Sequence, residues 1–179
     1  GIEQILINSN IEHPKMRRRP LAMGVVRLKD EIPKIFGHQL CRGTRPKLTV
    51  STHEVDGCQY LYLGGQVAED GAKHDDSSQI ETLTKALDHG LPWLCLKIAD
   101  IFVYRINRAE PDFGRGRRPD AAFVSTVSGM HVCWPTKLAL APALADQIIP
   151  RLQPTQYWDY PNFPNAQQGR YPWLSQSAI

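Results

Sequence analysis

Apolar and polar side chains alternate most regularly over residues 47–55, a pattern that is typical of a half-buried β-strand. Asp56-Gly57 follows directly, and this dipeptide favours the two-residue turn of a β-hairpin. Residues 58–67 are therefore expected to form the partner strand. Gly64-Gly65 inside that strand predicts a bulge, or a close approach by a ligand or another backbone, because two glycines weaken a strand interior.

A second segment, residues 117–152, predicts a strand, a turn at Ser128-Gly129, another strand, an apolar loop over residues 134–142 and then a helix. Pro142 suits the first turn of this helix, where a missing N–H costs nothing. Such a helix directs free N–H groups and the positive end of its dipole toward whatever the loop holds. The segment therefore has the outline of a site for an anion or an electron-rich ring, but a bare strand-loop-helix is also a common structural unit.

The remaining patterns predict an α+β fold. Apolar spacing predicts helices over residues 1–10 and 77–89, and residues 20–28 have the β-branched content of a strand. Strand segments are also expected over residues 93–107, whereas residues 30–41 are expected to form a loop. We therefore expect a mostly antiparallel sheet with flanking helices, together with the strand-strand-helix segment.

Composition and charge restrict the functional classes. The chain has 179 residues, of which 42% are hydrophobic and 22% charged, as in an ordinary globular domain. Its net charge is +3, and the one dense basic run covers residues 15–19. No aromatic stacking platform or nucleic-acid motif accompanies this run, so a solvated or paired role is favoured and no nucleic-acid partner is expected.

The cysteines and the apolar runs indicate the compartment. Cys41, Cys58, Cys95 and Cys133 contain no CxxC pair, and we expect free thiols in a reducing environment, with Cys95 and Cys133 as small core residues. No apolar run is long enough to span a membrane, and no signal-peptide pattern opens the sequence. We therefore expect a cytoplasmic location.

The two ends of the sequence are unusual. The chain opens on Gly1 and enters a helical pattern at once, which suggests a processed chain or a piece of a longer protein. Residues 155–179 are rich in proline and aromatic side chains without a helix or strand period. We expect them to form an extended tail on the surface.

Three side chains are candidates for chemistry, and each has a structural alternative. Arg118 suits a two-pronged grip on a carboxylate or phosphate, or it is a surface arginine paired with Asp120 or Glu110. His53 is either an acid–base or polar group of a pocket, or a solvent-facing strand histidine. Tyr62 either presents its hydroxyl to a pocket or packs across the sheet.

Other chemical signals are weaker or absent. Lys137 either neutralises an anion or extends along an apolar surface toward water. No histidines occur at metal-ligand spacing, so no metal is expected. The sequence contains no GxGxxG turn, no phosphate-binding GxxxxGK[ST] loop and no nucleophile-elbow motif.

Five runs of the sequence share the order of a known family. They are RRPLAM, LTVSTHEVDGCQYLYLGGQVAEDG, LPWL, RAEPDFGRGRRPDAAFV and CWPTKLALAPALAD. In this order they resemble the C-terminal half of FAD-dependent oxidoreductases of the D-amino-acid oxidase and glycine oxidase type, over residues 1–152. The resemblance implies FAD as the cofactor, a small amine or amino acid as the substrate, and hydride transfer from the substrate to the flavin.

The resemblance also divides the chain. Residues 1–19 correspond to a helix and linker of the FAD-binding domain, and residues 20–107 correspond to the sheet and helix of the substrate domain. Residues 108–154 correspond to the segment that returns to the FAD-binding domain, and residues 155–179 form the unmatched tail.

Candidate site residues follow from the same resemblance. Arg118 corresponds to the arginine that grips the substrate carboxylate, whereas His53, Tyr62 and Gln66 lie on strands that face the flavin. The residues of the flavin-contacting loop are Trp134, Pro135, Thr136, Lys137 and Leu138. This loop usually contains glycines in the family, and their replacement here by Pro135, Thr136 and Lys137 indicates a divergent subfamily.

The family binds the ADP part of FAD with a GxGxxG turn that this sequence lacks. We therefore expect the N-terminal FAD-binding half to be missing, with weak FAD binding and little activity in this chain alone. An exposed apolar seam is expected where that half packs. Two alternatives remain, namely a non-catalytic binding or scaffold domain derived from the same fold, and a subunit completed by a second chain.

Overall fold

A computed structural model describes residues 2–43, 45–112, 114, 120–134, 137–152 and 169–175. The helices are α1 (Ile2–Asn8), α2 (Gln66–Asp70), α3 (Asp76–Gly90) and α4 (Ala141–Ile148). The strands are β1 (Met16–Leu28), β2 (Phe36–Leu40), β3 (Pro46–Val55), β4 (Cys58–Gly64), β5 (Ile98–Pro111), β6 (Phe123–Val127) and β7 (Met130–Trp134). Short 3-10 turns are η1 (Gly71–Lys73), η2 (Leu138–Leu140), η3 (Ile149–Arg151) and η4 (Pro172–Ser175).

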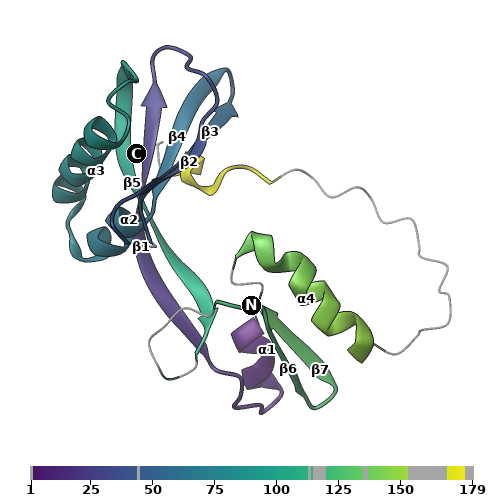
Figure 1. Cartoon of the computed structure of the whole chain (residues 1–179). Coiled ribbons are helices and arrows are strands. Elements are labelled where there is room, and N and C mark those ends of the chain that lie inside the picture. The colour runs from purple at the N-terminus through teal and green to yellow at the C-terminus, as the bar shows by residue number, and fades with distance from the viewer. Residues whose placement is uncertain are drawn as a thin grey trace. The chain divides into compact units, whose positions relative to one another are not determined.

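The chain divides into two compact units, which are described separately. The first contains residues 1–19 and 108–167, and the second contains residues 20–107 and 168–179. Five strands form one sheet in the order β2-β3-β4-β1-β5, while β6 and β7 form a separate hairpin (Figure 1). The pairs β2–β3, β3–β4 and β1–β4 are antiparallel, so the predicted α+β fold with a mainly antiparallel sheet is confirmed.

The β3–β4 hairpin forms as predicted. Asp56 and Gly57 both have positive φ, at 50° and 74°, which is the backbone conformation of a tight hairpin turn. The turn places Val55 opposite Cys58 and, further along, Ser51 opposite Tyr62. Because the side-chain period of a strand is two, this register fixes which residues share a face of the sheet.

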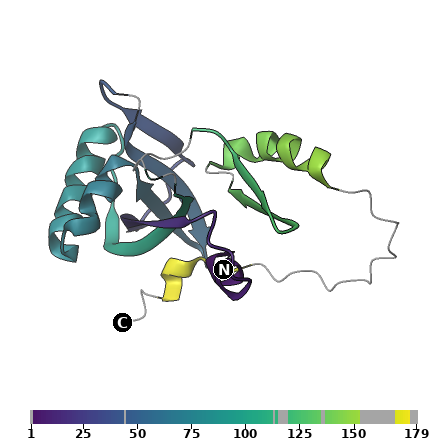
Figure 2. The ribbon, with the colours of Figure 1, turned by 90° about the horizontal axis from the view of Figure 1, so that it is seen from below.

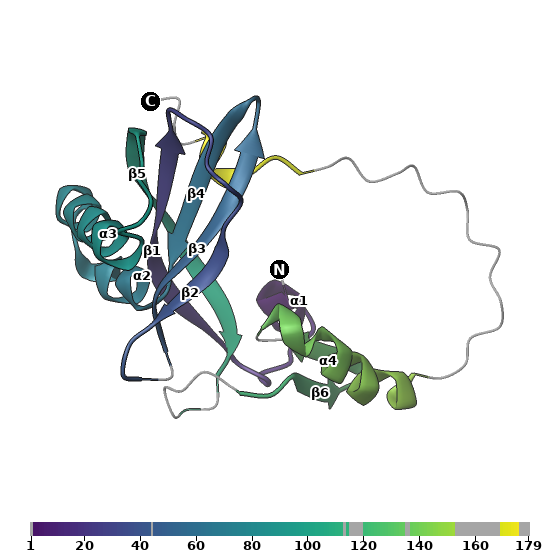
Figure 3. The same cartoon turned by 45° about the horizontal axis from the view of Figure 1, so that its top comes forward.

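One face of the sheet packs on α3. Leu83 and Leu87 of this helix are buried against Leu61 and Leu63 of β4, and the views in Figures 1 and 3 show α3 alongside the sheet. The helix begins where the Asp75 carboxylate accepts a hydrogen bond from the Ser78 N–H at 2.7 Å. The amphipathic helix expected over residues 77–89 is confirmed, with one more residue at each end.

The double glycine ends β4 and does not lie inside it. Gly65 has φ of 93°, and a Cβ atom on it would lie 2.9 Å from the carbonyl oxygens of Pro46 and Lys47. The close approach expected here is therefore made by another stretch of backbone. The strand predicted through Val67 is wrong beyond Gly64, because Gln66 begins α2.

The first unit contains the predicted strand-strand-helix segment. Ser128 and Gly129 have φ of 47° and 75° and connect β6 to β7, and Pro142 lies in the first turn of α4. Leu6 of the N-terminal helix α1 is buried with Val132 and Trp134 of β7. The order of elements predicted for residues 117–152 is confirmed over its described residues.

Other elements differ from the prediction. β1 begins at Met16, so much of the basic run lies in a strand and not in a linker, and β2 occupies part of the loop expected over residues 30–41. Cys95 is exposed and precedes β5, so its expected core position is wrong. Within the described ranges, no helix has the length and apolarity needed to cross a membrane.

The described part of the C-terminal segment is residues 169–175. It contains the turn η4, which lies away from α3 in Figure 2, and its Trp173 is 5% exposed. This differs from the expected extended tail, because one aromatic side chain of the segment is buried. Residues 153–168 and 176–179 lie outside the described part of the chain.

Candidate functional site

His53 lies on β3, on the face of the sheet that α3 does not cover. Its Nε2 is 2.8 Å from Ser51 Oγ, and its Nδ1 is 3.3 Å from the Tyr171 hydroxyl. Partial burial lowers the pKa of His53 from its ordinary value, because desolvation disfavours the charged ring. Burial therefore favours the neutral imidazole, in which one nitrogen donates and the other accepts.

Tyr62 shares this face with His53. It lies on the neighbouring strand β4 opposite Ser51, and its ring meets the imidazole edge-on with centroids 6.2 Å apart. The structure thus brings together two of the predicted substrate residues. Their position follows from strand alternation, since Leu61 and Leu63 on either side of Tyr62 enter the core against α3.

Aromatic residues from elsewhere in the chain complete this cluster. Trp173 stacks on Tyr62 with ring centroids 4.9 Å apart and planes at 17°, and it meets Tyr104 of β5 edge-on at 6.3 Å. Tyr171 lies against His53 at 5.1 Å. We call His53, Tyr62, Tyr104, Tyr171 and Trp173 the aromatic cluster. The sequence signalled only that the tail is rich in aromatic residues, because η4 is a single turn without periodicity.

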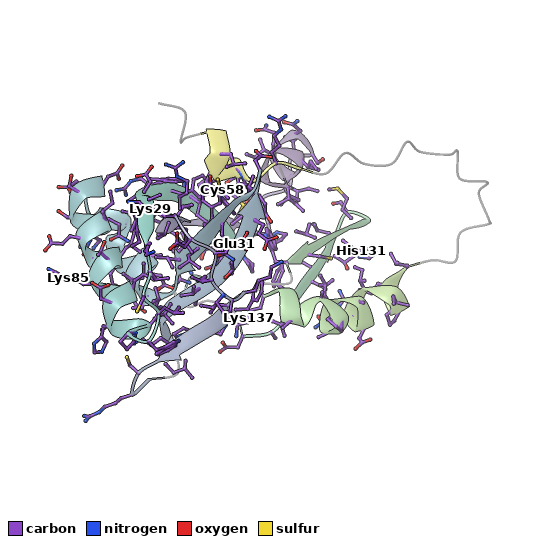
Figure 4. All side chains as sticks on the ribbon, turned by 90° about the horizontal axis from the view of Figure 1, so that it is seen from above. Lys29, Glu31, Cys58, Lys85, His131 and Lys137 are labelled. Atoms are coloured by element: carbon purple, nitrogen blue, oxygen red, sulfur yellow. The ribbon has the colours of Figure 1, made fainter. Side chains whose placement is uncertain are left out.

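Gln66 does not lie with His53 and Tyr62. It is the first residue of α2, where its amide donates to Asp70 Oδ1 at 2.8 Å, so its predicted place on a flavin-facing strand is wrong. Gln66 lines a hollow of about 640 Å³ together with Lys47 and with Lys85 of α3. Lys85 projects outward from α3 in Figure 4, and α3 contributes several residues to the lining of this hollow.

The predicted cofactor loop is partly described. Trp134 is buried and packs against Phe123 at 5.6 Å, whereas Lys137 is exposed and its carbonyl accepts a hydrogen bond from the Leu140 N–H. Leu138 begins η2, and Pro135 and Thr136 lie outside the described residues.

The helix that follows this loop has no side-chain cap. Its N-cap position is Leu140, an apolar residue whose side chain offers no acceptor to the first N–H groups of α4. These N–H groups therefore remain available to an acceptor outside the helix. The anion or ring site expected here from the sequence stays a prediction.

Arg118 lies outside the described residues, so its role as the carboxylate-binding arginine stays a prediction. One of its suggested structural partners, Glu110, is 2% exposed and forms ion pairs with Arg17 at 3.0 Å and Arg19 at 3.4 Å. Part of the basic run is therefore paired. This is one of the two roles, solvated or paired, that the sequence favoured. Within the described ranges, no three His, Cys, Asp or Glu residues gather as a metal site.

Comparison with known proteins shows what this architecture is similar to. The α+β fold with its mainly antiparallel sheet matches part of an FAD-dependent oxidoreductase. The solved structure concerned is the FAD-dependent oxidoreductase PA4991 from Pseudomonas aeruginosa, with a TM-score of 0.83 and 35% sequence identity. The match covers 99% of this chain and 51% of that one.

The sequence comparison agrees. The chain is 38% identical over 180 aligned residues to the "Probable FAD-dependent oxidoreductase PA4991" of Pseudomonas aeruginosa. The alignment covers 97% of this chain and 46% of the relative, so the chain spans about half the length of the curated relative that it matches. No protein-family model matches the sequence.

Proposed function

We propose that this chain is the C-terminal half of a flavin-dependent oxidoreductase that oxidises an amino acid or a related amine. The observation that carries the proposal is the similarity to PA4991, a protein named as an FAD-dependent oxidoreductase, along nearly the whole chain. The resemblance of the sequence motifs to the D-amino-acid oxidase and glycine oxidase type supplies the substrate class.

The described residues fit one edge of a flavin. The uncapped N-terminus of α4 presents N–H groups and a positive dipole end, which suit the electron-rich carbonyl edge of the ring. The sequence has no glycine-rich turn for the pyrophosphate, so the nucleotide part of FAD is held by the other half of the enzyme. When bound, the flavin supplies the hydride acceptor.

The chain's own residues bind and orient the substrate. Arg118 holds the substrate carboxylate through a bidentate, charge-assisted hydrogen bond. Burial favours the neutral form of His53, and a neutral imidazole can accept the proton of the substrate ammonium group. Its Nδ1 makes the longer and weaker contact, 3.3 Å to the Tyr171 hydroxyl, compared with 2.8 Å from Nε2 to Ser51.

Exposed apolar side chains support the proposal that a further half packs on the first unit. Ile149 and Leu152, at the end of α4, are 63% and 54% exposed, and Ile5 and Ile7 of α1 are 54% and 58% exposed. No residue of α4 is buried among the described residues. Large exposed apolar groups in one unit are typical of a surface that another part of the protein covers. We call these four residues the apolar seam.

The test is to purify this chain alone and together with the N-terminal half of the same enzyme, and to record flavin absorbance. The two halves should co-purify with stoichiometric FAD and oxidise amino acids, whereas this chain alone should carry little flavin. The double variant Ile149→Asp/Leu152→Asp should weaken the assembly, and the exposed Trp93→Ala should serve as the matched control. Stoichiometric FAD on the isolated chain would overturn the proposal.

The same exposed seam also suits the second candidate, a subunit completed by a separate chain that carries the GxGxxG turn. Purification from the organism's own extract separates the two, because only a natural subunit is found there as a gene product distinct from the chain that carries the GxGxxG turn. A non-catalytic scaffold, in contrast, binds no flavin in either preparation.

A further inference from the structure

Trp173 covers the two residues proposed to face the substrate. Its indole lies between Tyr62, at 4.9 Å, and Tyr171, at 4.6 Å, and its edge contacts His53 with centroids 5.5 Å apart. The indole therefore lies over these two side chains and limits the space beside them.

The indole N–H of Trp173 is buried and has no hydrogen-bond acceptor in the part of the chain that the structure describes. A buried donor without a partner costs about 1–3 kcal/mol, and native structures seldom leave one unsatisfied. Packing requires an aromatic ring but not this donor, which phenylalanine lacks. The tryptophan at this position indicates that an acceptor reaches it from outside the described residues, in at least one state of the protein.

We propose that Trp173 is a specificity-determining residue of the substrate site. Its ring restricts the space above Tyr62 and His53 to small substrates, and its N–H donates to an oxygen of the substrate carboxylate. The ligand class is therefore a small carboxylic acid that bears an amine, not one with a bulky aromatic side chain. This inference rests on the proposed function, because it takes the face of His53 and Tyr62 as the substrate side.

A purely structural role for Trp173 makes a different prediction. If the indole only anchors residues 169–175 to the sheet, its loss lowers stability and weakens the binding of all ligands by the same factor. If the indole limits ligand size, its loss changes the preference between small and large ligands. The ratio of two affinities therefore separates the roles, whereas stability does not.

The experiment uses the complete flavoprotein, with acetate and phenylacetate as small and large carboxylate probes that cannot be oxidised as amines. Their affinities are measured by titration calorimetry for the wild type, Trp173→Ala and Trp173→Phe. Trp93→Ala, which removes an indole that is 71% exposed, is the control. In turnover assays, glycine and phenylalanine serve as the corresponding small and large substrates.

Trp173→Ala should shift the preference toward phenylacetate by on the order of tenfold or more, because it opens the space of one ring above Tyr62. Trp173→Phe should keep the small-ligand preference and weaken acetate binding several-fold, because only the N–H is lost. Trp93→Ala should change neither value. An unchanged acetate-to-phenylacetate ratio in Trp173→Ala would overturn the inference.

Two further readouts keep the result interpretable. If Trp173→Ala fails to fold, acetate binding of Trp173→Phe decides, and an affinity equal to wild type refutes the role of the N–H. If the preference between acetate and phenylacetate changes as expected but no amino acid is oxidised, the specificity role stands and the proposed amine oxidation fails. If amino acids are oxidised with an unchanged size preference, the proposed function stands and the role of Trp173 fails.

Discussion

Glu110 accepts a hydrogen bond from Arg17 at 3.0 Å across 93 residues of sequence, and its carboxylate is 2% exposed. Arg19 approaches the other carboxylate oxygen at 3.4 Å. The two arginines come from β1 and the glutamate from β5, so the basic run of the sequence clamps two strands that are distant along the chain. The pairing with Glu110 gives this dense run of positive charge a structural explanation.

Glu110→Gln should lower the free energy of unfolding by about 2–3 kcal/mol. The amide keeps the shape of the side chain but removes the negative charge that two partly buried guanidinium groups contact. Glu54→Gln removes an exposed pair with Lys34 and should cost at most about 1 kcal/mol. Urea denaturation of the 179-residue chain measures both, and equal losses would contradict the clamping role of Glu110.

Gly65→Ala should be among the most destabilising glycine substitutions, with a loss of about 3 kcal/mol. The residue has a φ of 93°, and the new methyl group would lie 2.9 Å from two carbonyl oxygens of the β3 backbone. Gly37→Ala is the control, because a Cβ atom there meets nothing within 4 Å. Thermal unfolding monitored by circular dichroism compares the two, and a tolerated Gly65→Ala would show that this backbone contact is not required.

His53 should titrate below its ordinary pKa of 6.5, and Trp173→Ala should raise its pKa toward that value. The cause is desolvation, which the covering indole provides. NMR titration of the His53 ring, assigned with His53→Gln, measures the change, and Trp93→Ala should leave it unaltered. A His53 pKa that does not move in Trp173→Ala would mean that the indole does not exclude water from the imidazole.

The lowered pKa of His53 also determines how this residue makes stability depend on pH. His53 binds a proton more weakly in the folded chain than in the unfolded chain, so its contribution to stability is fully present above pH 6.5. Stability is lost as the pH falls through the lower, folded-state pKa. His53→Gln should abolish this part of the acid dependence, and denaturation curves at a series of pH values below neutrality check the sign.

The elements that the sequence predicted well are those with local causes. Asp56-Gly57 and Ser128-Gly129 adopt positive φ within their own turns, and Pro142 stabilises the first turn of its own helix. Each depends on the conformational preferences of a few adjacent residues. The hairpins and the last helix were therefore predictable without knowledge of the tertiary structure.

The elements that were missed depend on distant partners. β2 carries mostly exposed side chains and is a strand because it pairs with β3, so no alternation marks it. Gln66 begins a helix of five residues, which is too short for a periodic signal. Trp173 is buried because it packs against rings such as Tyr62, on a strand far away in sequence. This is why three of the five residues of the aromatic cluster were absent from the predicted site.

Arg118 carries the last prediction, which follows from the proposed function. In the complete flavoprotein, Arg118→Ala should raise KM for an amino acid by on the order of 100-fold, because a bidentate charged hydrogen bond to the carboxylate is lost. Arg118→Lys should recover only part of this loss, since an ammonium group cannot form the two-pronged contact. The neighbouring Arg117→Ala should have little effect.

A second substrate makes the assay specific for the carboxylate. For an amine that lacks a carboxylate, Arg118→Ala should leave KM nearly unchanged, so that the variant discriminates far less between the two substrates than the wild type does. A general loss of folding or of flavin would lower activity toward both substrates alike. An unchanged KM for the amino acid would remove Arg118 from the substrate site and leave His53 and Tyr62 as the remaining predicted substrate residues on the sheet face beneath Trp173.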